Sequence, residues 1–243
     1  RYWQAQVQPR NFLVTESSTA DGVTDVWFTF DTAVGRGSGL GRIKDDKAWT
    51  LLTTLDELKG FEENRGDRRP RGADHGAVRN RLTWKETLEQ EAQVMGSSEQ
   101  PFVLVVGGGQ GGIGLGARLR QLGVPFVVID KHPRPGDQWR NRYKSLCLHD
   151  PVWYDHMPYI KFPENWPVFS PKDKLGDWLE SYTKMMEIPY WSSTTCARAA
   201  YDEVSEKWTV EVVRDGESIT LHPTHLVLAT GMSGKPNIPV FAG

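Results

Sequence analysis

The stretch Phe102-Val-Leu-Val-Val-Gly107-Gly-Gly109-Gln-Gly-Gly112-Ile-Gly-Leu-Gly-Ala117 decides the fold of this chain. Its first five residues are apolar and rich in valine, which predicts a short strand buried on both faces. Gly107, Gly109 and Gly112 follow in G-x-G-x-x-G spacing, and leucines then recur at helical spacing. In such a unit the first glycine permits a tight turn, the second lets the backbone approach a pyrophosphate, and the third lets helix and strand pack closely.

The residues after the glycines strengthen this interpretation. Residues 124–129 predict a second buried strand that ends in Asp130, about twenty residues past the glycines, where a carboxylate can accept hydrogen bonds from the ribose of an adenine dinucleotide. The alternative is a βαβ unit with an incidental glycine turn. The acid at this distance favours a dinucleotide site.

Composition excludes several classes of protein. The 243 residues are enough for one large domain or two small ones with a real core. The net charge of −2 and the absence of a basic face argue against a nucleic-acid partner. The two cysteines, Cys147 and Cys196, form no disulfide framework, redox pair or zinc spacing, which suits a reducing, cytoplasmic location. We find no metal-ligand spacing, signal peptide or membrane-spanning apolar run.

Residues 1–60 differ in character from the rest. Residues 26–30 and 48–55 are aromatic and β-branched and predict strands. Residues 35–41 are glycine-rich but lack the third glycine of a phosphate loop, and a strand follows, so we interpret them as flexible strand sequence around a hairpin. The pattern suits the last strands of a small α+β sheet whose beginning is missing.

We expect residues 61–100 to form a linker with a short helix, and residues 101–243 to form the second domain. The linker begins polar and charged, and Thr83 followed by Glu86 suggests a capping box for a helix over residues 83–94. Beyond Asp130 we expect an ordered loop over residues 151–171, a helix over 175–186, a hairpin of strands 207–213 and 218–221, and a buried strand over 224–229. The predicted fold class is α/β: a three-layer, Rossmann-like domain with a mostly parallel sheet and a β-hairpin insertion, preceded by part of an α+β sheet.

Three motifs in this order carry a family resemblance: the glycine fingerprint with Asp130, the segment Gly136-Asp-Gln-Trp139-Arg140, and Ala229-Thr230-Gly231 followed by two prolines. Over about residues 100–243 the chain resembles the flavin-containing class of flavin-dependent monooxygenases, in their YUCCA-like and fungal or bacterial branch. The N-terminal piece resembles, more vaguely, the end of a SnoaL- or NTF2-like domain.

The resemblance implies that the fingerprint binds FAD. The cofactor-binding residues it implies are Gly107, Gly109 and Gly112 at the pyrophosphate, Asp130 and Lys131 near the adenosine ribose, Gln138, Trp139 and His149 near the flavin, and Ala229, Thr230 and Gly231 in the turn that links the FAD and NADPH domains. His149 could equally be a hydrogen-bonded histidine in the shell of the fold. The other histidines discussed, His132, His156, His222 and His225, are interpreted as ordinary, and Trp139, Trp153 and Trp166 as a packing cluster.

For the full-length protein the resemblance implies an enzyme. NADPH reduces the flavin, O2 adds to give a C4a-(hydro)peroxyflavin, and a small organic substrate is oxidised at nitrogen, sulfur or a carbonyl, with no side chain acting as a catalytic base. The family's hallmark segment and its NADPH fingerprint would follow Gly243, so we expect the chain as given to lack most of the NADPH site and to be inactive alone. A homo-oligomer is compatible with the sequence.

Two other classes stay open. One is a different two-nucleotide flavoprotein reductase, although the missing C-x-x-C argues against the disulfide type and Gly136-Asp-Gln-Trp139 favours the monooxygenase. The other is a non-catalytic module that binds FAD or another nucleotide.

Overall fold

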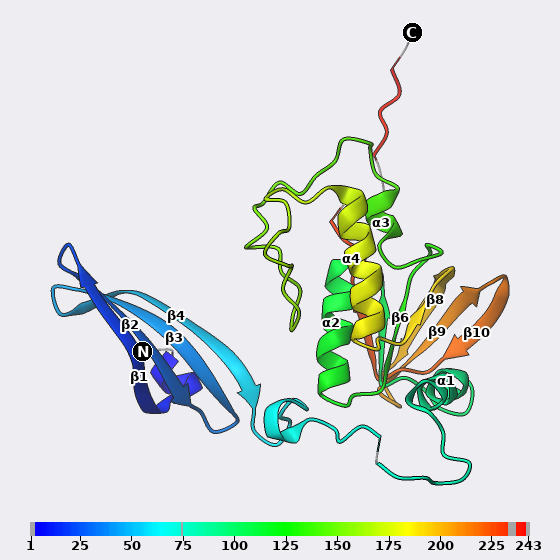
Figure 1. Cartoon of the computed structure of the whole chain (residues 1–243), viewed down its shortest axis with the longest axis horizontal. Helices are drawn as coiled ribbons and strands as arrows, with labels where there is room; N and C mark the ends of the chain where they lie inside the picture. Colours follow the sequence, from blue (N-terminus) through cyan, green and yellow to red (C-terminus); the bar gives the residue numbers. More distant parts are fainter. Residues whose placement is uncertain (1–2, 74, 233–236, 242–243) are drawn as a thin grey trace. The chain divides into compact units, whose positions relative to one another are not determined.

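The computed structural model describes residues 3–73, 75–232 and 237–241 of the chain (Figure 1). The chain divides into two compact units, Arg1–Arg68 and Arg69–Gly243. The boundary falls inside the charged segment that follows Gly60 in the sequence. No helix among the described residues is long and apolar enough to cross a membrane.

The first unit is one antiparallel sheet with strand order β1-β2-β3-β4. Its strands are β1 (Arg10–Ala20), β2 (Val23–Asp31), β3 (Gly35–Lys44) and β4 (Lys47–Leu58). Its helical residues are limited to a π-helical turn at Trp3–Val7 and a 3-10 turn at Gly66–Arg68, so the described part of this unit contains no α-helix. The two strands predicted here lie within β2 and β4.

The glycine-rich stretch is a strand, β3, paired antiparallel with β2 and β4, which agrees with the predicted strand around a hairpin rather than a phosphate loop. A Cβ atom on Gly37 would lie 2.5 Å from Cζ of Phe30, and one on Gly39 would lie 2.5 Å from Cζ of Phe28. The aromatic rings of β2 therefore occupy the space that side chains on β3 would need. The glycines permit this close approach within a sheet.

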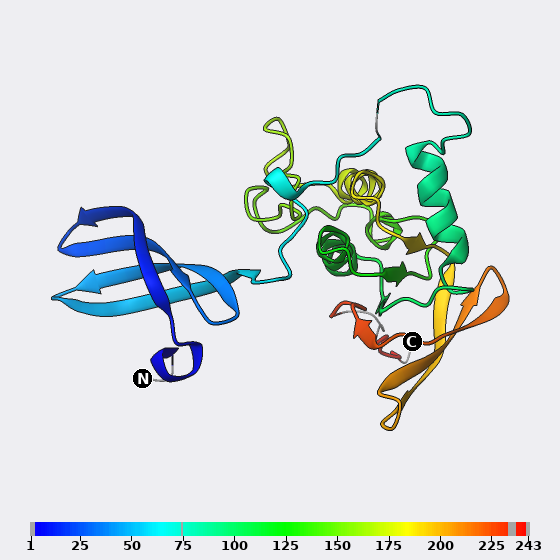
Figure 2. The same cartoon turned by 90° about the horizontal axis from the view of Figure 1, so that it is seen from below.

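The second unit has three layers (Figure 2). The central parallel sheet has the order β11-β5-β6-β7, formed by β5 (Val103–Val106), β6 (Phe126–Ile129), β7 (Tyr190–Trp191) and β11 (His225–Leu228). Helices α2 (Gln110–Gln121) and α4 (Lys172–Met185) pack on one face around a core that includes Val105, Ile113, Phe126 and Leu179. An antiparallel sheet of β8 (Thr194–Asp202), β9 (Lys207–Arg214) and β10 (Glu217–Leu221) packs on the other face.

This architecture confirms the predicted Rossmann-like α/β fold, with local differences. The helix predicted near residue 83 is α1 (Trp84–Val94), and its capping box is present: Thr83 Oγ1 accepts from the Glu86 N–H at 3.2 Å, and the Glu86 carboxylate accepts from the Thr83 N–H at 2.7 Å. Helix α4 begins three residues earlier than predicted, since it starts at Lys172 rather than Leu175. The predicted hairpin gains β8 as a third strand.

The strand order predicts a ligand-binding position at the carboxyl end of β5. The chain moves from β5 to β6 to β7 in one direction, and β11 then returns to the opposite side of β5. In an open parallel sheet, ligands bind beyond the carboxyl ends of the strands where the order reverses. Here the reversal lies between β5 and β11, so the predicted place is the pair of turns that begin at Gly107 and Ala229.

Candidate dinucleotide site

The turn after β5 passes directly against the end of β11. Gly107 has φ +109°, and its N–H donates to the Ile129 carbonyl at 2.9 Å. A Cβ atom on Gly107 would lie 2.4 Å from the Ala229 carbonyl oxygen and 3.1 Å from the Thr230 nitrogen. The first fingerprint glycine is therefore required both by its backbone conformation and by this contact. The structure brings Gly107, Ala229 and Thr230 together.

Gly112 allows helix α2 to lie on that turn. A Cβ atom there would lie 1.9 Å from the Gly107 carbonyl oxygen and 3.4 Å from Cγ1 of Val105. This is the close helix–strand packing expected of the third fingerprint glycine. Gly116, one turn further along α2, packs against the sheet in the same way, with its Cβ position 3.1 Å from the Phe126 ring.

Gly109 is different, because nothing in the chain fills the space beside it. A Cβ atom on Gly109 would meet only Gln138, at 3.6 and 3.9 Å, which is ordinary contact. Gly109 is the N-cap of α2, in extended conformation, and no side chain caps the helix there. The first N–H groups of a helix lack intrahelical partners and bind phosphate well. This uncapped helix start beside an open glycine fits a pyrophosphate, the part of FAD that the fingerprint was predicted to bind.

The acid after β6 is turned inward. Asp130 is 8% exposed. Its Oδ2 accepts a hydrogen bond from the Gly108 N–H at 2.7 Å, and its Oδ1 accepts from the His132 N–H at 2.9 Å and lies 2.7 Å from His132 Nδ1. The carboxylate thus holds the glycine turn in place through its hydrogen bond from the Gly108 N–H. Lys131, predicted to lie near the same ribose, is exposed.

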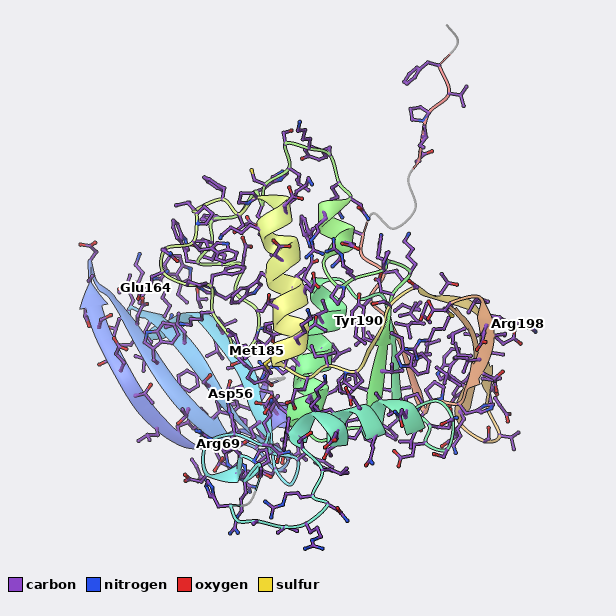
Figure 3. The ribbon with its side chains drawn as sticks, turned by 45° about the vertical axis from the view of Figure 1, so that its right-hand side comes forward. Asp56, Arg69, Glu164, Met185, Tyr190 and Arg198 are labelled. Atoms are coloured by element: carbon purple, nitrogen blue, oxygen red, sulfur yellow. The ribbon has the colours of Figure 1, made fainter. Side chains whose placement is uncertain are left out.

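Tyr190 supports the same turn, although no motif in the sequence marks it. Its hydroxyl donates to the Gly108 carbonyl at 3.2 Å, and a Cβ atom on Gly108 would lie 2.1 Å from that hydroxyl oxygen. Burial, together with the charges of Asp130 and Asp137, raises the pKa of Tyr190, which keeps the phenol protonated as a donor. Tyr190 belongs to the two-residue strand β7 and is labelled in Figure 3. A strand this short leaves no periodic signal in the sequence.

Helix α3 (Asp137–Arg140) joins this turn to the rest of the unit. Gln138 Nε2 donates to the Gly108 carbonyl at 3.3 Å, and Trp139 Nε1 donates to Gln110 Oε1 at 3.1 Å. Gln138 Oε1 is buried and has no hydrogen-bond partner among the described residues. Buried amide oxygens normally have one. An orphaned acceptor beside the open glycine is a further feature that fits a bound group with a donor.

Arg140 anchors α3 to α4. Its guanidinium donates to Asp137 at 2.9 Å and to both Asp177 and Glu180 at 2.8 Å. Burial raises the pKa of the Asp137 carboxyl, but the hydrogen bonds from Arg140 and Arg134 outweigh it, so that pKa lies below its ordinary value. The predicted supporting role of Arg140 has this physical basis.

Helices α3 and α4 also lie close together because two glycines, Gly136 and Gly176, meet between them. Gly136 has φ +89°, and a Cβ atom on it would lie 2.1 Å from the Gly176 carbonyl oxygen. Gly176 was not predicted, because its partner lies forty positions earlier in the sequence and no local pattern marks it.

The other predicted residues are exposed or make different contacts. His149 is exposed, and no hydrogen bond between described residues joins it to the glycine turn. Thr230 and Gly231 are exposed beyond β11. Trp139 and Trp166 pack against the same hydrophobic core, as predicted, and the ring centroid of Trp166 lies 4.9 Å from that of Phe162 and 5.4 Å from that of Trp178. Trp153 is 57% exposed and does not join them.

Comparison with known proteins shows what the chain resembles. A family model for the NAD(P)-binding Rossmann-like domain matches residues 105–166. The chain is 33% identical over 141 residues to a probable indole-3-pyruvate monooxygenase, YUCCA9, of Arabidopsis thaliana, which covers 58% of this chain and 34% of that protein. It is 34% identical over 140 residues to an uncharacterized CzcO-like oxidoreductase of Geobacillus kaustophilus, covering 58% of this chain and 38% of that protein. The chain therefore spans little more than a third of the length of these relatives.

Solved structures show the same fold. A flavin-containing monooxygenase from Stenotrophomonas maltophilia superposes with a TM-score of 0.52 at 24% identity, over 59% of this chain and 42% of that one. The bacillithiol disulfide reductase Bdr of Bacillus cereus also superposes with a TM-score of 0.52, at 18% identity, over 58% of this chain and 42% of that one. At these identities the likeness establishes the Rossmann-like fold.

Proposed function

We propose that this chain, whose second unit is related to the flavin-dependent monooxygenases, is the FAD-binding part of an NADPH-dependent monooxygenase. The observation that carries the proposal is the open space beside Gly109 at the uncapped start of α2. It lies where the strand order reverses between β5 and β11, which is where such sheets bind dinucleotides.

The residues of this chain would bind and orient the cofactor. Gly109 and the first turn of α2 would hold the pyrophosphate, and the Ala229–Thr230 turn would flank it. Gln138 and Trp139 lie on the α3 side of the same turn and would border the flavin. FAD, when bound, would supply the redox chemistry with O2 and NADPH. The substrate would be a small organic molecule oxidised at nitrogen, sulfur or a carbonyl.

No side chain in this proposal acts as an acid, base or nucleophile. The groups around the glycine turn are instead committed to structure, since Asp130, Tyr190 and Arg140 all bond to protein atoms. Across the described ranges, no cluster of three or more His, Cys, Asp or Glu side chains is arranged to hold a metal ion.

The monooxygenase class is favoured over a disulfide reductase by the relatives and by the cysteines. The two relatives named above, at 33% and 34% identity, are a probable monooxygenase and an uncharacterized oxidoreductase. Cys147 is exposed and Cys196 is half-buried in β8, and both are free thiols. Free thiols are also the basis on which we propose a cytoplasmic location, which fractionation of cells that produce the protein would test.

The test is a pair of glycine substitutions, Gly109→Ala and Gly111→Ala. In the protein itself neither added methyl group meets a tight contact: the nearest atom lies at 3.6 Å for position 109 and beyond 4 Å for position 111. Only the methyl group at position 109 would stand in the path of the pyrophosphate. We expect Gly109→Ala to weaken FAD binding at least about tenfold, whereas Gly111→Ala binds like the wild type. Equal FAD affinity in both variants would contradict the proposal.

A further inference from the structure

The fingerprint acid of this chain has little capacity left for a ligand. The Asp130 side chain is 9% exposed, and its two oxygens already receive the Gly108 N–H, the His132 N–H and the His132 ring. Aspartate is also one methylene shorter than glutamate, so its carboxylate stays close to the strand end. Both carboxylate oxygens are therefore occupied by donors of the protein itself.

The side chain of His132 is more exposed to solvent than that of Asp130. Its side chain is 22% exposed, more than twice the fraction of Asp130. Its backbone is held on both sides: the carbonyl accepts from the Ser193 N–H at 2.9 Å, and the Asp130 carbonyl accepts from the Thr194 N–H at 2.8 Å. The imidazole is therefore attached to a fixed segment that joins the ends of β6 and β8.

The contact with Asp130 also determines which ring nitrogen carries the proton. An ionised carboxylate only accepts hydrogen bonds, so Nδ1, at 2.7 Å from Oδ1, is the donor. In the neutral imidazole Nε2 is then an acceptor. A carboxylate that fixes the tautomer and orientation of a histidine is a common supporting arrangement where the second nitrogen binds a ligand.

We propose that His132, through Nε2, hydrogen-bonds the adenosine ribose of the bound dinucleotide, and that Asp130 is the residue that positions it. The ligand group is a hydroxyl of the ribose diol, at the place beyond β6 where this fold holds the ribose. This inference rests on the proposed function, because it assigns a residue to the same cofactor site.

His132→Asn is the informative variant. The asparagine amide can still donate to Asp130 Oδ1, so the support of the glycine turn is retained while the Nε2 side of the ring is removed. His222→Asn is a matched control, since His222 is exposed next to β10 and interacts only weakly with Thr209, at 3.4 Å. The ligands are FAD, ADP, 2′-deoxy-ADP and 3′-deoxy-ADP, whose dissociation constants are measured by calorimetry with the 243-residue chain.

The readout is the ratio of affinities for ADP and its deoxy analogues. In the wild type and in His222→Asn we expect ADP to bind about five- to tenfold more tightly than one of the deoxy analogues, the amount expected of one hydrogen bond. In His132→Asn this preference should disappear, so that ADP and the deoxy analogue bind about equally. Thermal unfolding of each variant confirms that the fold is retained.

The outcomes separate this inference from the proposed function. If His132→Asn keeps the full preference for ADP, Asp130 makes the ribose contact and the inference is wrong. If the wild type binds FAD but shows no preference for ADP over either analogue, the inference fails while the proposed function stands. If the wild type binds neither FAD nor ADP, both are overturned.

Discussion

The three fingerprint glycines are alike in sequence but serve different physical needs. Gly107 and Gly112 are required by the protein, since a side chain at either position would strike backbone atoms at 2.4 and 1.9 Å. At Gly109 the chain leaves room for a side chain, so the proposed cofactor is what would require a glycine there. The sequence predicted all three positions from their spacing. Only the contacts distinguish the two glycines that build the turn from Gly109, which we propose faces the cofactor.

Gly112→Ala tests the packing of α2 on the turn. We expect it to destabilise the second unit by about 1–3 kcal/mol, the usual cost of forcing a methyl group into a packed contact. Gly111→Ala, in the same helical turn with open space around it, should be neutral or slightly stabilising because alanine favours helix. Urea unfolding followed by circular dichroism measures both. Equal stability of the two variants would show that the helix does not approach the turn this closely.

Tyr190 should make stability depend on alkaline pH. Its pKa is raised in the folded protein, mainly by burial, so the folded state holds its proton where the unfolded state, with an ordinary pKa of about 10, loses it. The contribution of the Tyr190 hydroxyl to the free energy of unfolding is fully present below pH 10 and is lost as the pH rises above 10. In Tyr190→Phe the unfolding midpoint should therefore decline less between about pH 9 and pH 11 than in the wild type. If the unfolding midpoints of Tyr190→Phe and the wild type decline equally with pH, the Tyr190 hydroxyl is not buried as described.

At the scale of elements, Arg140 joins α3 to α4 through its hydrogen bonds to Asp177 and Glu180. Arg140→Lys replaces a planar group that bonds three carboxylates by a single ammonium, so we expect a loss of about 1–3 kcal/mol in the free energy of unfolding. Arg142→Lys is the control, since Arg142 is exposed and lies over the Trp139 ring at 5.0 Å. Chemical denaturation of both variants gives the comparison, and a loss of similar size in Arg142→Lys would refute the anchoring role.

The elements that sequence predicted well are those with local signals. β5, β6 and α2 follow from apolar runs and helical spacing, and α1 follows from the Thr83–Glu86 capping pair. β1 was missed because it is exposed along its whole length and most of its residues are polar, and β7 was missed because it has two residues. At the site, Asp130 and Gln138 were predicted from motifs, whereas the support from Tyr190 and Gly176 depends on long-range packing that no short window contains.

At the scale of the whole molecule, all the proposed cofactor residues lie in the second of the two units. A ligand stabilises the unit that binds it, by about 2.7 kcal/mol at a hundredfold excess over the dissociation constant. We therefore expect FAD to raise the midpoint of one calorimetric transition, that of residues 69–243, and to leave any transition of residues 1–68 unchanged. A shift in the transition of the first unit alone would place the site elsewhere. Limited proteolysis would assign each transition to its unit.

We propose that FAD binds at the turn after β5, which begins at Gly107 and lies against the end of β11. The most direct measurement is a titration of the purified chain with FAD, followed by flavin absorbance and fluorescence, and a parallel titration with NADPH. We expect FAD to bind stoichiometrically and to change its spectrum on binding. Gly109→Ala should weaken this binding, and NADPH should not displace FAD. A chain that ignores FAD but binds NADPH in a manner sensitive to Gly109→Ala would contradict the flavin assignment and make this a nicotinamide site.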